Sequence, residues 1–122
     1  MSTLNITGRQ MDDVNILDLD GKILLGETNR QLHEAIYELI AEGKNRVVLN
    51  LEKVSSIDSS GLGEIVASFS TLAKAGGTLK LVNIPERVTD VMTVTKLYTV
   101  FDVYDSEADA VNSFDERGSA AA

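Results

Sequence analysis

Carboxyl and hydroxyl groups meet at one point of the sequence, Asp58-Ser59-Ser60. The residues before it, 47–51, form an apolar run that predicts a buried strand. After it, apolar residues from Leu62 to Ala73 recur at helical spacing, which is typical of an amphipathic helix. Asp and Ser side chains cap helix amides, so either Asp58 or Ser59 supplies the cap. The positive end of the helix dipole would stabilise a phosphate group there, although a capped helix without further role explains the same residues.

The hydroxyl groups at this turn lack the partners that hydrolysis or nucleotide chemistry requires. A serine hydrolase needs a histidine beside its serine, and His33 is the only histidine in the chain. The Gly-x-Ser-x-Gly elbow and the Gly-x-x-x-x-Gly-Lys loop are absent, and Gly61-Leu62-Gly63 falls short of Gly-x-Gly-x-x-Gly. Without cysteine, thiol chemistry is excluded as well. The sequence therefore predicts a binding module without a cofactor, and not an enzyme.

Three carboxylates near the turn, Glu52, Asp58 and Glu64, are candidate metal ligands. Carboxylate oxygens bind hard cations, but scattered acidic side chains more often form a solvated rim. A single histidine and no cysteine leave too few ligands for zinc. We therefore expect an acidic rim and no metal.

Composition places the chain among globular proteins of one domain. It has 122 residues, of which 43% are hydrophobic and 25% are charged. The formal net charge of −8 argues against binding to nucleic acid, which requires clustered Lys and Arg. The sequence has no visible signal peptide and no apolar run of about 20 residues. We therefore expect a cytoplasmic protein that does not insert into a membrane.

The elements that position the turn follow from hydrophobic spacing and from turn residues. Two alternating segments joined at Met11-Asp12-Asp13 predict a hairpin. Thr28 and Gln31 form a capping box that opens a helix ending at Gly43. The predicted strands are 4–9, 14–20, 47–51, 78–82 and 100–104, and the other predicted helices begin near residues 60, 85 and 106.

The later helices have their own start signals. Pro85 suits the first turn of the third helix, and Ser106 with Asp109 caps a short fourth helix. The order ββαβαβαβα predicts a single α/β domain over residues 1–122, with a mixed sheet covered by about four helices. Its ordered core spans about 4–114, and residues 115–122 are expected to fray.

The segment after the second predicted strand is an apolar loop or a strand extension between two glycines. It consists of Lys22, Ile23, Leu24, Leu25 and Gly26. Core packing explains its three apolar residues better than an exposed contact with a partner does.

The apolar run 47–51 followed by Ile57-Asp58-Ser59-Ser60-Gly61-Leu62-Gly63 resembles the STAS domain family, in particular the bacterial anti-sigma factor antagonists. The family motif is an apolar strand, a short loop, and then Asp-Ser-Ser/Thr-Gly-Leu/Ile-Gly at the start of a helix. Segments 75–82 and 96–101 also resemble family segments. The resemblance covers nearly the whole chain, from about Leu4 to Phe114.

The resemblance implies a partner switch. In the family, the first Ser after the Asp, here Ser59, is phosphorylated by a partner that is both anti-sigma factor and serine kinase. The unphosphorylated protein binds this kinase and frees a sigma factor, the phosphorylated protein does not bind, and a serine phosphatase resets the cycle. Ser60 is the second choice, and Ser55 and Ser56, in the predicted preceding loop, are weaker candidates. The implied cap and partner surface consists of Asp58, Ser59, Ser60, Gly61, Leu62, Gly63 and Glu64.

One departure from the family pattern keeps other functions open. Many antagonists carry an acidic residue shortly after the glycine that ends the second strand, where this chain has the basic Lys22 before apolar residues. The loop 22–26 thus becomes a possible partner contact of a different kind. The alternatives are a STAS adaptor for a transporter subunit, a cyclase or a signalling phosphatase, and a module that senses phosphate or a nucleotide.

Overall fold

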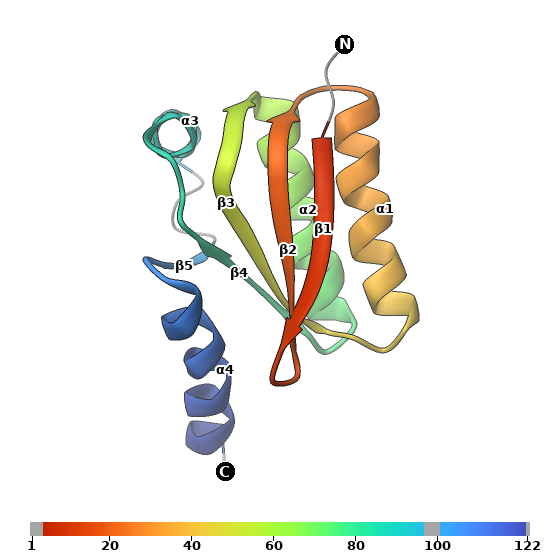
Figure 1. The fold of residues 1–122 in the computed structure, drawn as a ribbon, viewed down its shortest axis with the longest axis vertical. Helices are drawn as coiled ribbons and strands as arrows, with labels where there is room; N and C mark the ends of the chain where they lie inside the picture. The colour runs from red at the N-terminus through yellow and green to blue at the C-terminus, as the bar shows by residue number, and fades with distance from the viewer. Residues whose placement is uncertain (1–3, 97–100, 122) are drawn as a thin grey trace.

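The computed structural model describes residues 4–96 and 101–121, which form a sheet with helices on both faces (Figure 1). In the described chain, the strands are β1 (Leu4–Met11), β2 (Val14–Ile23), β3 (Arg46–Ile57), β4 (Thr78–Val82) and β5 (Asp102–Tyr104). The helices are α1 (Glu27–Ala41), α2 (Ser59–Lys74), α3 (Glu86–Thr95) and α4 (Glu107–Ala121). The spatial order is β1-β2-β3-β4-β5, with β1 antiparallel to β2 and all other neighbours parallel. The predicted α/β class and the order ββαβαβαβα are confirmed.

The two faces of the sheet are covered unequally (Figure 1). Alternate residues of the strands, such as Leu17, Leu49 and Leu81, join α1, α2 and α3 in a large apolar cluster. The opposite face has a smaller cluster in which Val48 and Phe114 participate, under α4. Helix α4 lies over β3, β4 and β5, and its apolar residues share the smaller cluster with Val14 and Ile16 at the start of β2. The rest of this face, formed by β1 and the later part of β2, has no helix over it in the described chain.

Strands β2 and β3 are longer than the sequence predicts. They pair in parallel to their ends, where Lys22 lies opposite Ser56 and Ile23 opposite Ile57. The apolar run ends at Leu51, but the pairing continues across exposed polar residues. The placement of Ser55 and Ser56 in a loop is therefore wrong, because both lie in β3.

The predicted capping box of α1 is also wrong. The cap position lies two residues earlier, at Gly26 with φ of 107°, and the helix begins at Glu27. The Thr28 hydroxyl is buried and bonds back to the chain, accepting from the Leu24 amide at 2.9 Å and donating to the Leu24 carbonyl at 3.0 Å. The Gln31 side chain donates to the carbonyl of Leu4 at 3.2 Å and thereby ties α1 to β1. The Thr28 side chain therefore holds the loop before the helix, and the Gln31 side chain joins the helix to β1.

The carboxyl-terminal elements agree with the predictions in most respects. The Ser106 hydroxyl accepts from the Asp109 amide at 3.1 Å and caps α4, whose inward residues Ala110, Val111 and Phe114 are buried. Helix α4 extends to Ala121 and is longer than predicted, while fraying of residues 115–122 stays a prediction. In the described chain the last strand begins at Asp102, and residues 97–100, which include most of a family-like segment, lie outside the described residues.

Candidate functional site

Asp58 is the cap of α2. Strand β3 ends at Ile57, and the extended backbone of Asp58 (φ −106°, ψ 179°) leads into the helix. Its Oδ1 accepts a hydrogen bond from the Gly61 amide at 2.8 Å, which satisfies one of the free amides of the first turn. Of the two cap candidates the structure therefore selects Asp58, and Ser59 is the exposed first residue of the helix.

The same carboxylate joins α2 to the loop between β2 and α1. Asp58 Oδ2 accepts from the Leu25 amide at 3.1 Å, and the Asp58 amide donates to the Ile23 carbonyl at 3.3 Å. Two loops that are distant in the sequence thus form one surface. Because Asp58 bonds to Leu25 and Gly61 at once, any change in its charge environment acts on both loops.

Leu25 projects from this surface. Ile23 is buried and Leu24 half-buried, but 78% of Leu25 is exposed, so the expectation that all three residues pack in the core is wrong for Leu25. The alternation of side chains between the two faces of the sheet ends with β2 at Ile23. Gly26, with its positive φ, then turns the chain into α1. Leu25 is therefore an exposed apolar side chain beside the α2 turn.

The two glycines of the motif have different roles. A Cβ atom on Gly61 would lie 2.1 Å from the carbonyl oxygen of Ile23, so only glycine allows this approach of helix and strand. A Cβ atom on Gly63 would meet nothing within 4 Å, and the residue is exposed. Gly61 therefore sets the position of α2, whereas Gly63 lowers the profile of the surface.

Helix α1 extends the surface beside α2, which the sequence did not predict. The Asn29 amide donates to the Ser60 carbonyl at 3.2 Å. The His33 ring has its Nδ1 3.2 Å from Glu64 Oε2 and stacks on Tyr37 with ring centroids 4.1 Å apart. The spacing of four between Asn29, His33 and Tyr37 places them on one stripe of the helix, and this spacing is visible in the sequence.

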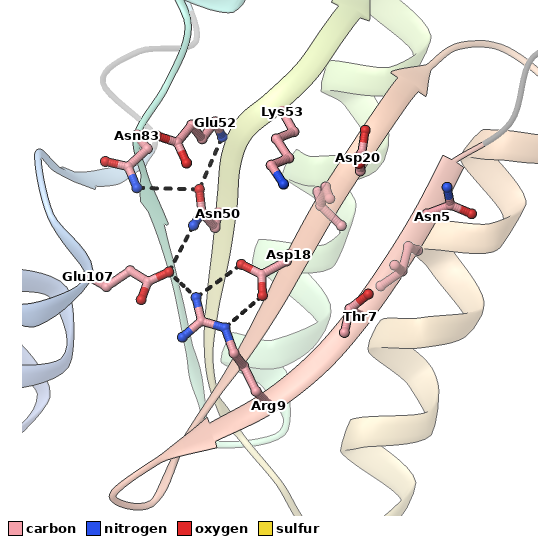
Figure 2. Close-up of a pocket in the computed structure, with 12 residues that line it drawn as sticks. Asn5, Thr7, Arg9, Asp18, Asp20, Asn50, Glu52, Lys53, Asn83 and Glu107 are labelled. Carbon is pink, nitrogen blue, oxygen red and sulfur yellow. Dashed lines mark hydrogen bonds and ion pairs between the residues drawn. The ribbon is translucent and has the colours of Figure 1, made fainter.

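The carboxylates expected to form a rim do not lie together. Asp58 caps α2 and Glu64 lies beside His33, but Glu52 belongs to the open sheet face (Figure 2). Among residues 4–96 and 101–121, no group of three or more His, Cys, Asp or Glu side chains is placed to hold a metal ion.

Figure 2 shows a polar hollow of about 830 Å³ on the open sheet face, away from the α2 turn. Arg9 donates to both oxygens of Asp18, at 2.6 and 3.0 Å, and to Glu107 of α4. Asn50 donates to Glu107 at 2.8 Å and accepts from Asn83 at 3.4 Å. The hydrogen bonds from Arg9 hold the pKa of the Asp18 carboxyl below its ordinary value. These groups chiefly satisfy one another, so the network fastens α4 to the sheet.

Comparison with known proteins decides the family. A family model described as the STAS domain matches residues 5–110. The chain belongs to the STAS domain family. The family prediction made from the motif is thereby confirmed, and the α2 turn with its cap is the family motif in three dimensions.

Relatives of this STAS domain carry one recurring name. A Thermotoga maritima protein provisionally named anti-sigma factor antagonist is 33% identical over 102 residues, covering 83% of this chain and 89% of that protein. A crystal structure from Thermotoga maritima, with the same provisional name, has a TM-score of 0.78 and 28% identity, covering 88% of this chain and 92% of that one. SpoIIAA of Bacillus, solved in its phosphorylated form, has a TM-score of 0.67 and 19% identity over 92% of this chain and 99% of that one, which shows the shared fold.

No helix within the described ranges has the length and apolar character needed to cross a bilayer.

Proposed function

We propose that this STAS domain is an anti-sigma factor antagonist controlled by phosphorylation of Ser59. The unphosphorylated form binds an anti-sigma factor that is also a serine kinase and so frees a sigma factor. The kinase transfers the terminal phosphoryl group of ATP to the Ser59 hydroxyl, which loses its proton while ADP leaves, and a serine phosphatase later hydrolyses the ester. The observation that carries the proposal is an exposed serine directly after the cap of α2, beside an exposed leucine.

A phosphate on Ser59 would change the surface more than the fold. It adds about −1.5 to −2 charges at neutral pH, next to Asp58 and at the positive end of α2. The helix terminus stabilises this charge within the protein, whereas a partner that covers it must desolvate a dianion. A change from nearly full to nearly empty binding requires about 5.5 kcal/mol of differential affinity. Desolvation of the phosphate and its repulsion by the partner at this contact would supply this difference in affinity.

The contacts of Asp58 add a second route for the same signal. Its carboxylate accepts from the amides of Leu25 and Gly61, so it holds the exposed leucine in place while it caps the helix. A dianion on the neighbouring residue repels this carboxylate and competes for the same amides. We therefore expect phosphorylation to loosen the loop that presents Leu25 and to weaken the apolar contact as well.

A different partner remains the second candidate function, on one observation. Lys22 is exposed at the position where many antagonists carry an acidic residue. A basic side chain there favours an acidic partner surface, as an adaptor for a transporter subunit, a cyclase or a signalling phosphatase would meet. A sensor of phosphate or a nucleotide would differ from the switch and from the adaptor, because phosphate or the nucleotide alone would raise its melting temperature without any partner.

Intact mass and peptide mapping of the protein from its native cells, under two growth conditions, test the proposal. We expect one phosphoryl group on the peptide that contains Ser59, varying with condition, absent in Ser59→Ala and retained in the matched variant Ser60→Ala. Because Asp58 is the cap, the free energy of unfolding of Ser59→Ala should lie within about 0.5 kcal/mol of the wild-type value. Unchanged phosphorylation of Ser59→Ala would show that the residue is wrong. If no condition yields phosphate, the switch is wrong and an unregulated adaptor is favoured.

A further inference from the structure

Strand β1 leaves one edge of the sheet open in the described chain. It is the first strand in the spatial order and pairs only with β2 across its eight residues. Proteins usually protect such edges with proline, lysine or a bulge, because unpaired amides and carbonyls accept another strand. Strand β1 contains neither proline nor lysine, its pairing with β2 is regular, and its one arginine, Arg9, bonds to Asp18 on the open face. The backbone amides and carbonyls of this edge are therefore available to pair with another strand.

The hairpin determines which backbone groups point outward. Asp12 and Asp13 form a two-residue turn, so Met11 and Val14 close the ladder. In an antiparallel pair, every second residue directs its amide and carbonyl to the partner strand and the others direct theirs away. The carbonyl of Leu4 points away, because it accepts from the side chain of Gln31 in α1. The same alternation turns the amides and carbonyls of residues 6, 8 and 10 to the open edge.

An acidic groove runs beside this edge. A hollow of about 580 Å³ lies between β1 and α1, with Ile6 and Gly8 on one side. Glu34 and Glu38 of α1 and Glu42 at its C-cap, all exposed and spaced by four residues, line it. Glu42 also pairs with Lys44 at 3.0 Å. The helix lies alongside the strand (Figure 1). Its carboxylates thus form a row that follows the edge.

The spacing of this row fits an extended chain. Residues four apart in a helix are about 6 Å apart along the axis, and residues two apart in a strand are separated by about 6.7 Å. A strand added to β1 would direct every second side chain toward α1, where each could meet one glutamate. Lys or Arg at alternating positions is the complementary pattern. Pairing between two copies of the chain would instead bring two acidic rows together in a protein of net charge −8.

We propose that the open edge of β1 is a docking site for an extended basic segment of a partner protein, with Lys or Arg at every second position. The segment adds a strand to the sheet, its backbone pairs with residues 6, 8 and 10, and its basic side chains face Glu34, Glu38 and Glu42. Backbone pairing supplies affinity, and the charge pattern supplies specificity. The site lies on β1 and α1 and does not depend on phosphorylation of Ser59.

The test uses a fluorescent peptide, Lys-Val-Lys-Val-Lys-Val-Lys, and fluorescence anisotropy with the full chain at two salt concentrations. A matched peptide with an N-methyl group on every backbone amide has the same charges but no amide hydrogen to donate to a strand. We expect binding of the first peptide and roughly tenfold weaker binding of the second, because only the charge attraction is left.

Two protein variants locate the site. Gly8→Pro removes an outward amide and keeps the hydrogen bonds to β2, so it should weaken binding of the peptide about tenfold. The triple variant Glu34→Gln, Glu38→Gln, Glu42→Gln should bind the peptide about tenfold more weakly, and its binding should depend much less on salt. A control with the same charge change elsewhere, Glu86→Gln, Asp90→Asn, Asp109→Asn, should bind as wild type. If Gly8→Pro fails to fold, as judged by circular dichroism, the methylated peptide and the triple variant decide.

Three results would overturn the proposal. Equal binding of the two peptides would show that only general charge attraction operates. Equal loss in the two triple variants would mean the same. Dimers of the free protein in sedimentation experiments, abolished by Gly8→Pro or by the α1 triple variant, would show that a second copy occupies the edge.

Discussion

The start of α2 and the open sheet face hold their polar groups in different ways. At the α2 start, backbone atoms approach each other directly: the Ile23 carbonyl occupies the space that a side chain on residue 61 would need, and the amides of Leu25 and Gly61 share one carboxylate. On the open face, the side chains of Arg9, Asp18 and Glu107 reach across from three elements and stay partly exposed (Figure 2). Backbone contact leaves no freedom for substitution, whereas long side chains can rearrange. The first region should therefore be rigid and intolerant of substitution, whereas the second should tolerate it.

The largest expected effect is at the first region. Gly61→Ala forces α2 away from the end of β2 and should cost about 3 kcal/mol of the free energy of unfolding. Gly63→Ala, two residues later in the same helix, is the matched control and should stabilise by about 0.5–1 kcal/mol, since alanine favours a helix and nothing obstructs it. Urea denaturation of both variants measures the difference. Similar costs for the two variants would refute backbone contact as the constraint.

A smaller effect is expected on the open face. Arg9→Met removes a partly exposed ion pair and should cost about 0.5 kcal/mol at neutral pH. The lowered pKa of folded Asp18 implies that this stabilisation is complete above the ordinary carboxyl pKa and is lost as pH falls through the folded value. Below about pH 4, the stability of wild type should therefore fall more steeply than that of Arg9→Met. Denaturation between pH 2 and 7 checks this. In the Arg9→Met background, Asp18→Asn should leave the slope nearly unchanged, and a large further change would contradict the pairing.

The smallest effect is expected under α4, where Lys80 of β4 is fully buried. Its Nζ contacts the hydroxyl of Ser113 and lies 4.3 Å from the ring centre of Phe114 and 5.2 Å from that of Tyr104. Attraction to the rings offsets the cost of burying the charge, so Lys80→Met should change the free energy of unfolding by less than about 0.5 kcal/mol. Thermal denaturation measures it. A loss of several kcal/mol would show that the polar groups under α4 are as constrained as the α2 turn.

The same contrast explains what could be predicted from the sequence. The order of elements and a cap at Asp58 or Ser59 rest on local signals, namely hydrophobic spacing and residue type, whereas the choice of Asp58 comes from the structure. The full length of β3 rests on pairing with β2, and the exposure of Leu25 rests on where that pairing ends. Contacts such as Arg9 with Glu107, 98 positions apart, leave no local pattern at all. Local chemistry therefore predicts the site, whereas long-range pairing determines the surface around it.

The parallel pairing of β2 and β3 to their last residues has a consequence for recognition. Because Ile23 lies opposite Ile57, the chain leaves both strands at the same level, and Leu25 and Ser59 follow within two residues on each side. A partner that binds one of them holds the other at a high effective concentration. Two individually weak contacts then act as a bivalent pair, which binds more tightly than either contact alone.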